Sequence, residues 1–572
     1  MSYAPTSITR TLLIGVSLTL AVMQAMAQVP TTVPEATDRE AAIDAWVRAH
    51  AVPLGTVEPD ADRRDLQPLL DPLSKARVVA VGESTHGTRD FFQFKDRLWR
   101  FLVEEAGFRA LAMEAGFAEA QAIDAYVTRG EGTAEEALEG LGIGVWNTEE
   151  VLALIEWTRA YNDTVPVSER VRFYGIDPRS ARLELERLGA LLHDVTDPQA
   201  LALLAQADSL RAILGFEYRH AEGPTRAALD DALRDLGSLI DRAPPDALTL
   251  SEGETARQHL TALGQIRDLS RERALGQPEL LGSGYYHLRD RIVPKADSLR
   301  QFLYTYDPTL PGRLDRFLNA FLDAHDQLNT ATRASFDLAY PDQHWDALAH
   351  ALHAHTYLMQ NQHRMRGATT ADVERARLWA SDIALYTQTA RAYTLLPSPR
   401  PNPRDAAMAE NVRWVLDTEG PDARVMVWGH NWHITTKPMA PGAGRMGTHL
   451  AETLGDDYVA VGFAFDRGQF TAGDRRPQAE PMTTAVMTVG PAKDGSIDAT
   501  LARADLPLFY LDLGAVPEDG PVRAWLSEPR PLRDVPASFL PSNEINYYVD
   551  TVLLDDYDAV VFVGETQAAR RR

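Results

Sequence analysis

The sequence predicts an α/β protein: a mainly parallel sheet core covered by helices, with a large helical insertion forming a lid or cleft wall. Two observations predict this class. Short apolar strand patterns alternate with helical patterns near the start of the chain and return after residue 400, which is typical of a helix-covered parallel sheet. The stretch between these two parts has helical periodicity and few strand signals.

The first part of the sheet is predicted from short apolar runs at residues 77–82, 108–113 and 171–176. Helices are predicted between or after these runs, at residues 90–105, 118–129 and 148–161, from the spacing of their apolar residues. In the first of these helices, Phe91, Phe94 and Leu98 recur on one side. A further helix is predicted before the sheet, over residues 38–49, with Asp38 as its cap.

The middle of the chain is rich in Leu, Ala and charged residues. Its clearest predicted helices are 183–192, 226–240, 255–271, 314–328 and 370–390. A Pro-rich segment at 396–403 then marks the return to the core. After it, we predict a helix at 405–416 and strands at 424–428, 458–465, 506–513 and 559–563. We therefore expect a signal peptide at 1–27, a helical lead-in at 28–75, a first core part at 76–179, a helical insertion at 180–395 and a second core part at 396–572.

The first 27 residues predict a secretory signal peptide. Arg10 is their only charged side chain, an apolar run follows at 11–23, and Ala25-Met26-Ala27 matches an A-x-A cleavage site. The run is shorter than the roughly 20 residues that a membrane-spanning helix needs. The alternative is an uncleaved N-terminal anchor. We expect cleavage after Ala27, export to the periplasm or the medium, and no membrane association afterwards.

Composition excludes several classes of function. The chain has 572 residues, 45% of them hydrophobic, so it can bury a large core. It has no cysteine, which excludes disulfides, a thiol nucleophile and thiolate-bound zinc. Its net charge of −24 becomes −25 without Arg10, and such a surface repels phosphate backbones. We expect a small-molecule partner and no nucleic acid; the oligomeric state does not follow from the sequence.

Polar side chains follow the predicted strands at the points where they end. In open α/β sheets, ligand sites lie beyond the carboxyl ends of the strands, so these side chains are expected to converge. They are Glu83, His86, Glu114, Asp177, His430 and His433. Each one also has a structural explanation: Glu83 or Asp177 could cap a helix, and the histidines could be packed loop residues. Their shared position at four strand ends favours a site.

This set of residues suits ester hydrolysis by an activated water molecule. His86 would be the general base, and Glu83 or Glu114 would hold its second ring nitrogen. His430 or His433, with the nearby cation Lys95, would stabilise negative charge on a carbonyl oxygen. His287 is a candidate lid residue, because the surrounding Tyr-Tyr-His-Leu-Arg-Asp combines aromatic and basic side chains.

Three alternatives stay open. Ser84 could be a nucleophile, but a G-x-S-x-G elbow would need Gly where His86 stands, so a turn residue is expected. A divalent metal, zinc or manganese, could instead make a metal-dependent hydrolase of esters or amides, although no cofactor is our expectation. Its ligands would be Glu83, His86, Glu114, His430 and His433. The histidine cluster at 350–355 is a second candidate site for a metal. The third alternative is an exported binding protein without enzymatic activity.

The motifs resemble the erythromycin esterase family. They are Gly-Glu-Ser-Thr-His-Gly at 82–87, Ala-Met-Glu-Ala-Gly-Phe at 112–117 and Trp-Gly-His-Asn-Trp-His-Ile at 428–434. Tyr-Gly-Ile-Asp at 174–177, Arg404-Asp405, Met408, Asn411, Met446-Gly447 and Tyr557-Asp558-Ala559 also fit. The resemblance extends over about residues 76–566.

The resemblance implies a carboxylic-ester hydrolase acting on macrolide lactones, an antibiotic-resistance function, without an essential metal. It implies His86 as the base, with Glu83, Glu114, His430 and His433 in the same site. Where the family typically has Arg nine residues after the base, this chain has Lys95, which keeps the charge but loses the two-pronged guanidinium. We predict Lys95, Asp177 and His287 as substrate-binding residues. The resistance members are cytosolic, so export is a departure that leaves the natural substrate open.

Overall fold

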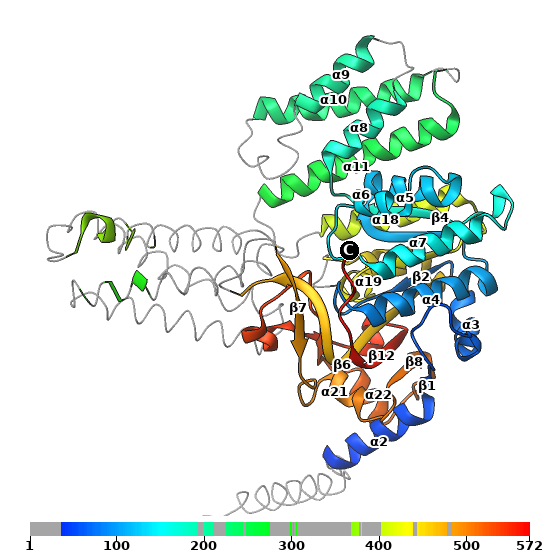
Figure 1. The fold of residues 1–572 in the computed structure, drawn as a ribbon, viewed down its shortest axis with the longest axis vertical. Helices are drawn as coiled ribbons and strands as arrows, with labels where there is room; N and C mark the ends of the chain where they lie inside the picture. Colours follow the sequence, from blue (N-terminus) through cyan, green and yellow to red (C-terminus); the bar gives the residue numbers. More distant parts are fainter. Residues whose placement is uncertain are drawn as a thin grey trace, which may run out of the picture.

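The computed structural model describes residues 36–192, 198–209, 223–243, 247–274, 402–438, 443–476 and 483–572, with isolated residues between 298 and 379 (Figure 1). Its centre is a ten-stranded sheet with a main strand order of β1-β8-β12-β6-β2-β5-β3-β4, and with β7 and β10 paired to β6. The strands are β1 (Val52–Pro53), β2 (Val78–Val81), β3 (Ala110–Gly116), β4 (Arg172–Asp177), β5 (Val425–Trp428), β6 (Tyr458–Asp474), β7 (Thr484–Val489), β8 (Leu508–Asp512), β10 (Ser538–Phe539) and β12 (Ala559–Thr566). A separate two-stranded sheet pairs β9 (Arg530–Arg533) with β11 (Tyr548–Thr551).

The central strands of the sheet are parallel. β2 pairs in parallel with β5 and β6, β3 with β4 and β5, and β12 with β6. Antiparallel pairing is confined to β1, β7 and β8. The carboxyl ends of the parallel strands therefore meet at one edge of the sheet, and the predicted mainly parallel core is confirmed.

Helices cover both faces of the sheet. One face carries α3 (Gln67–Ser74), α4 (Arg89–Ala106), α5 (Phe117–Arg129), α6 (Ala134–Gly140) and α7 (Glu149–Asn162). The other carries α2 (Ala36–His50), α18 (Pro403–Glu419), α20 (Met446–Leu454), α21 (Ile497–Ala502) and α22 (Pro521–Leu526). Each face has its own cluster of buried apolar side chains, because strand residues alternate between the two faces: Val79 packs on the first and Val78 on the second.

A helical part follows β4 in the chain and precedes α18 (Figure 1). It consists of α8 (Ala181–Leu191), α9 (Pro198–Ser209), α10 (Gly223–Arg242) and α11 (Leu250–Ala274), and it has a hydrophobic cluster of its own. Buried polar contacts join it to the core. Asn411 of α18 donates from Nδ2 to the carbonyl oxygen of Ile176 at 2.7 Å, and Gln258 of α11 donates to Asn411 Oδ1 at 2.9 Å.

Short elements complete the description. They are α19 (Asn431–Ile434), α23 (Leu553–Asp556) and the 3-10 turns Arg64–Leu66, Val167–Glu169, Gly455–Asp457, Leu513–Ala515 and Pro541–Tyr547. Within the part of the chain that the structure describes, no helix combines the length and the apolar character needed to cross a lipid bilayer.

The observed elements differ from the predicted ones in instructive places. The first helix begins at Ala36, so Asp38 lies inside it and is not its cap. β6 continues well past the predicted end at residue 465, because its second half pairs with β7. The short strands β1, β7, β9, β10 and β11 were not predicted. The predicted helix at 314–328 and most of 370–390 lie outside the described residues.

Candidate active site

The first polar network is built on Glu83, in the loop that follows β2. Its Oε1 lies 2.7 Å from Nδ1 of His86, and its Oε2 accepts from Lys95 Nζ at 2.7 Å and from Trp428 Nε1 at 3.0 Å. Glu83 and Lys95 are completely buried. A carboxylate that accepts from three groups needs a hydrogen on Nδ1 of His86. In the uncharged form of the ring, that hydrogen on Nδ1 leaves Nε2 as a proton acceptor.

His86 is held between two other rings. Its centroid lies 4.6 Å from that of His430 and 5.9 Å from that of Trp146. The His86 side chain retains 12% exposure, and no described residue bonds to its Nε2. The ring therefore keeps some contact with solvent, and Nε2 is its nitrogen without a partner among the described residues.

Gly87 has a packing reason to be glycine. Its carbonyl oxygen accepts from the Thr471 amide at 2.9 Å, and a Cβ at position 87 would lie 2.0 Å from the Thr471 carbonyl oxygen. Contacts under 3.0 Å force the backbone apart. The loop that carries His86 can approach β6 this closely only because residue 87 has no side chain.

Gly87→Ala is expected to lower the unfolding free energy by about 1–3 kcal/mol, the usual cost of overpacking. Urea unfolding followed by circular dichroism measures it. The matched control is Gly189→Ala, because a Cβ at residue 189 of α8 meets nothing within 4 Å and alanine suits a helix interior. Equal stability of the Gly87→Ala variant and the wild type would contradict the role assigned to the close approach.

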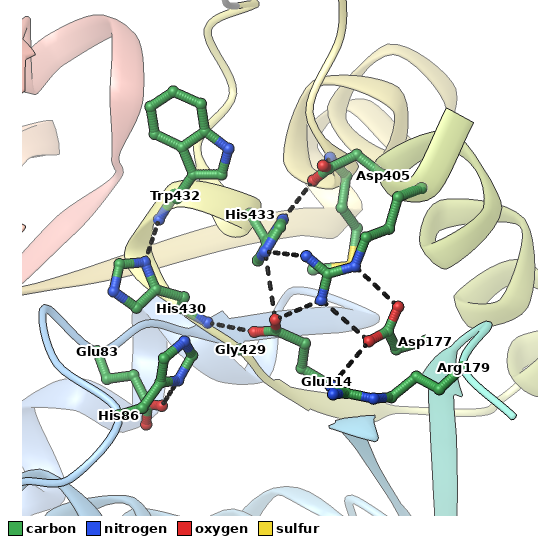
Figure 2. A network of polar contacts seen from close by, with 12 residues as sticks. Glu83, His86, Glu114, Asp177, Arg179, Asp405, Gly429, His430, Trp432 and His433 are labelled. Atoms are coloured by element: carbon green, nitrogen blue, oxygen red, sulfur yellow. Dashed lines mark hydrogen bonds and ion pairs between the residues drawn. The ribbon is translucent and has the colours of Figure 1, made fainter. Parts of the chain in front are cut away.

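The second polar network joins the ends of β3 and β4 to α18 (Figure 2). Arg404 Nη2 donates to Glu114 Oε1 at 2.8 Å, and Nε and Nη2 each donate to an oxygen of Asp177 at 2.9 Å. Arg179 Nη1 also reaches Asp177, at 3.3 Å. Glu114 and Asp177, both labelled in Figure 2, each form an ion pair with this guanidinium group.

His433 completes the second network. Its Nδ1 lies 2.7 Å from Asp405 Oδ1, and its Nε2 lies 3.2 Å from Glu114 Oε1. Burial lowers the pKa of His433, but the charges of Asp405 and Glu114 outweigh burial and raise it to about 10. His433 is therefore an imidazolium at neutral pH. Arg404 Nη1 lies 3.1 Å from the same Nε2. The positive charge of Arg404 lowers the pKa of His433 and so opposes the two carboxylates.

The free energy of unfolding is expected to fall as the pH rises from about 6.5 to about 10, because of His433. The folded pKa lies above the unfolded value, so the stabilisation is fully present below the unfolded pKa and is lost as the pH rises through the folded one. Urea unfolding at the two ends of this window measures it. His433→Gln should lose less stability across the window than the wild type does. Equal losses in both proteins would refute the assignment.

His430 links the two networks. Its backbone amide donates to Glu114 Oε2 at 3.0 Å, while Lys95 Nζ donates to the neighbouring Gly429 carbonyl oxygen at 3.4 Å. Its side chain accepts from the Trp432 amide at Nδ1, at 3.3 Å, and donates from Nε2 to the Val535 carbonyl oxygen, at 3.0 Å. Burial, the first cause, holds the pKa of His430 well below its ordinary value, and a positive charge on protonated His86 lowers it further. His430 is thus a neutral ring with both nitrogens engaged.

The structure places the other predicted residues as follows. Lys95 lies behind Glu83 with no exposed surface, and burial lowers its pKa to about 8. Ser84 is completely buried, and its hydroxyl has no hydrogen-bond partner among the described residues. The helix caps are Thr88 for α4 and Ser180 for α8, so neither Glu83 nor Asp177 caps a helix. His287 and the histidines at 350–355 lie outside the described residues.

The candidate metal ligands are divided between the two networks, and each carboxylate has a cation beside it. Glu83 pairs with Lys95, and Glu114 pairs with Arg404. Among the described residues, no group of three or more His, Asp or Glu side chains is placed to hold a metal ion. A metal bound to Glu83 would compete with Lys95, and one bound to Glu114 would compete with Arg404.

Sequence reasoning assigned no role to Arg404 and Asp405, although both belong to the quoted motif residues. Their position in the sequence could have indicated that they lie at the site. A helix that leads into a parallel strand starts near the carboxyl edge of the sheet, and both residues stand at the start of α18, which leads into β5. The Val535 carbonyl oxygen gave no such signal, because its contact with His430 depends on long-range folding. Arg179 contacts Asp177, only two residues away, but was given no role in the sequence analysis.

This chain is similar in sequence to known proteins. A family model described as Erythromycin esterase matches residues 103–293 and 279–566. The Bacillus subtilis (strain 168) protein YbfO, whose name describes it as a hydrolase, is 21% identical over 477 residues, 82% of this chain and 81% of that protein. Erythromycin esterase type II of Escherichia coli is 34% identical over 166 residues, 28% of this chain and 38% of that protein.

A solved structure of a protein named for succinoglycan biosynthesis has the same fold. It is 19% identical, with a TM-score of 0.50, and the superposition covers 93% of this chain and 99% of that one. At this identity, the likeness concerns the fold alone.

Proposed function

Because this chain belongs to the erythromycin esterase family, we propose that it is an exported hydrolase that cleaves a carboxylic ester or lactone with water activated by His86. The observation that carries the proposal is the Glu83–His86 pair. Glu83 orients the ring and fixes its tautomer at Nδ1, which leaves Nε2 to accept a proton. This is the orientation that a general base requires.

In the proposed reaction, His86 both accepts the proton of water and returns it to the leaving group. His86 Nε2 takes a proton from water while the water oxygen bonds to the ester carbonyl carbon. The oxyanion that forms is stabilised by the cations of the second network, among which Arg404 and Arg179 have side chains 19% and 43% exposed. The C–O bond then breaks, and the His86 imidazolium returns its proton to the leaving alkoxide.

The charge balance of the site supports an uncharged reacting group on the substrate. In the second network, the carboxylates of Glu114, Asp177 and Asp405 face the cations Arg404, Arg179 and His433. In the first, Lys95 faces Glu83. Neither network has an excess of charge that would attract a charged ligand. A lactone meets this requirement, and the named activity of the Escherichia coli relative makes a macrolide lactone the first candidate.

Export and metal independence are parts of the same proposal. The apolar run and the A-x-A site within residues 1–27 support export. The pairing of each candidate carboxylate with Lys95 or Arg404 supports chemistry without a metal. A metal-dependent hydrolase using the same residues is the alternative, and sensitivity to a chelator separates the two.

The test is incubation of residues 28–572 with erythromycin, alone and after treatment with a chelator. Mass spectrometry follows the addition of one water to the drug. Water addition that survives the chelator supports the proposal, and loss of activity that added zinc or manganese restores supports the alternative. If the drug stays intact in every arm, the macrolide assignment fails, and a panel of other esters and lactones tests the hydrolase itself.

A further inference from the structure

The segment that follows β12 crosses the carboxyl edge of the sheet beside the His86 loop. β12 and β2 are both parallel to β6 and lie on either side of it, so the chain leaves β12 at the edge where His86 stands. The Arg89 amide donates to the Gln567 carbonyl oxygen at 2.8 Å, and the Ala569 amide donates to the Gly87 carbonyl oxygen at 2.9 Å. The segment therefore lies along the residues immediately after His86.

The same segment then reaches the loop that precedes α7. The Glu149 amide donates to the Arg570 carbonyl oxygen at 2.9 Å, and the Arg572 amide donates to the Asn147 carbonyl oxygen at 3.1 Å. The Arg570 side chain pairs with both Glu149 and Glu150, at 2.9 and 3.1 Å. Figure 1 marks the end of the chain beside α7.

The loop before α7 carries Trp146, the ring that packs edge-on against His86. Trp146 is 1% exposed, and its indole nitrogen has no partner among the described residues. The indole is thus placed by packing and by its loop, and that loop is bonded to the segment after β12. The segment contacts both sides of the His86–Trp146 pair.

We propose that residues 567–572 are a positioning element for the general base: they bond the His86 loop to the Trp146 loop and so hold the His86 ring in place. This inference rests on the proposed function, because it concerns the orientation of the same base. The segment touches neither water nor substrate in the proposed reaction. It acts through Gly87, whose carbonyl oxygen it shares with the Thr471 amide.

A positioning role has a kinetic signature. Misplacing a catalytic group by roughly 1 Å can cost about 10²-fold in rate, without loss of the groups that bind substrate. Loosening the segment should therefore lower kcat and leave KM nearly unchanged. It should also open the His86 ring to reagents, since the Trp146 ring that covers it is no longer fixed.

The sharpest variant is Ala569→Pro, which removes the amide hydrogen that this segment donates to the Gly87 carbonyl oxygen and leaves the hydrogen bond from Thr471 in place. Ala569→Ser keeps that hydrogen and is its matched control. A second pair is Arg570→Ala, which breaks the ion pairs with Glu149 and Glu150, and Arg572→Ala, which removes an exposed side chain that makes no hydrogen bond or ion pair with the described part of the chain. The second pair keeps the inference testable if proline at position 569 prevents folding.

Two readouts are needed. Steady-state kinetics on the cleaved ester should show kcat falling about 10- to 100-fold in Ala569→Pro, less in Arg570→Ala, with KM within about twofold and both controls near wild type. Peptide mapping after diethylpyrocarbonate treatment should show faster modification of His86 in the same two variants, relative to His449, which is 32% exposed and lies on α20.

Unchanged kcat and unchanged His86 reactivity in both variants would overturn the inference, as would a loss of activity in which His86 and His449 become reactive together. The second outcome means general unfolding rather than positioning. If the wild type hydrolyses no ester at all, the proposed function fails by itself. The reactivity of His86 still decides whether the segment holds its ring.

Discussion

His86→Gln is expected to lower kcat/KM for ester hydrolysis by about 10²- to 10⁴-fold, the range that a general base contributes. Glutamine can still reach Glu83 with its amide, but it has no nitrogen that accepts a proton. Because the His86 side chain is 12% exposed and makes one polar contact, the fold should survive the change. Steady-state kinetics and a thermal melt measured on the same preparation test both statements.

His449→Gln is the matched control, because His449 is partly exposed on α20 and the one ion pair of its side chain with a described residue is to Glu452 at 3.9 Å. It should retain wild-type kcat/KM. A His86→Gln variant that hydrolyses the ester at the wild-type rate would show that another group activates the water. Ser84 would then be the next residue to test, since its buried hydroxyl has no partner among the described residues.

Arg404→Leu is expected to have the largest effect on stability. Arg404 contributes to pairs with Glu114 and Asp177, which are almost completely buried. Removing one partner of a buried pair leaves an uncompensated charge, at a cost of about 3–5 kcal/mol. Since the Arg404 side chain is 19% exposed, water screens part of that charge, and we expect the lower end of the range. Urea unfolding measures the change.

The same variant should lose hydrolysis, because the oxyanion loses a cation at the edge of the site. Arg413→Leu is the control on the same helix: its guanidinium group makes one exposed hydrogen bond, to Thr453, and its loss should change stability by about 0.5 kcal/mol or less. If Arg404→Leu unfolds no more easily than Arg413→Leu, the pairs at Glu114 and Asp177 do not stabilise the fold.

The general location of the site could be predicted from sequence because it depends on local pattern. A buried parallel strand is a short apolar run, and the residue that follows it must lie at the carboxyl edge. Glu83, Glu114 and Asp177 were predicted as site residues in this way, and in the structure they lie at that edge. The alternation of strands and helices likewise predicted the covered parallel sheet.

Local pattern could not divide the predicted residues into two networks. Glu83 could equally have bonded a histidine from β5 or the cation Lys95, and sequence spacing does not choose between these partners. In the structure, α4 packs on one face of the sheet and directs the Lys95 side chain beneath the loop after β2, so Lys95 is the cation that pairs with Glu83. The structure also pairs His433 with Asp405. Asp405 lies at the start of α18, the helix that follows the helical part and leads into β5.

The sequence by itself determined the fold class, the edge of the sheet at which polar residues gather, and the family motifs. Only the tertiary structure decided which carboxylate meets which cation, which histidine is charged and which is neutral, and that residues 567–572 reach the His86 loop. The physical reason is range. Periodicity and strand ends are set within a few residues, whereas a charge state depends on partners a few ångströms away in space, brought there by segments distant in the chain.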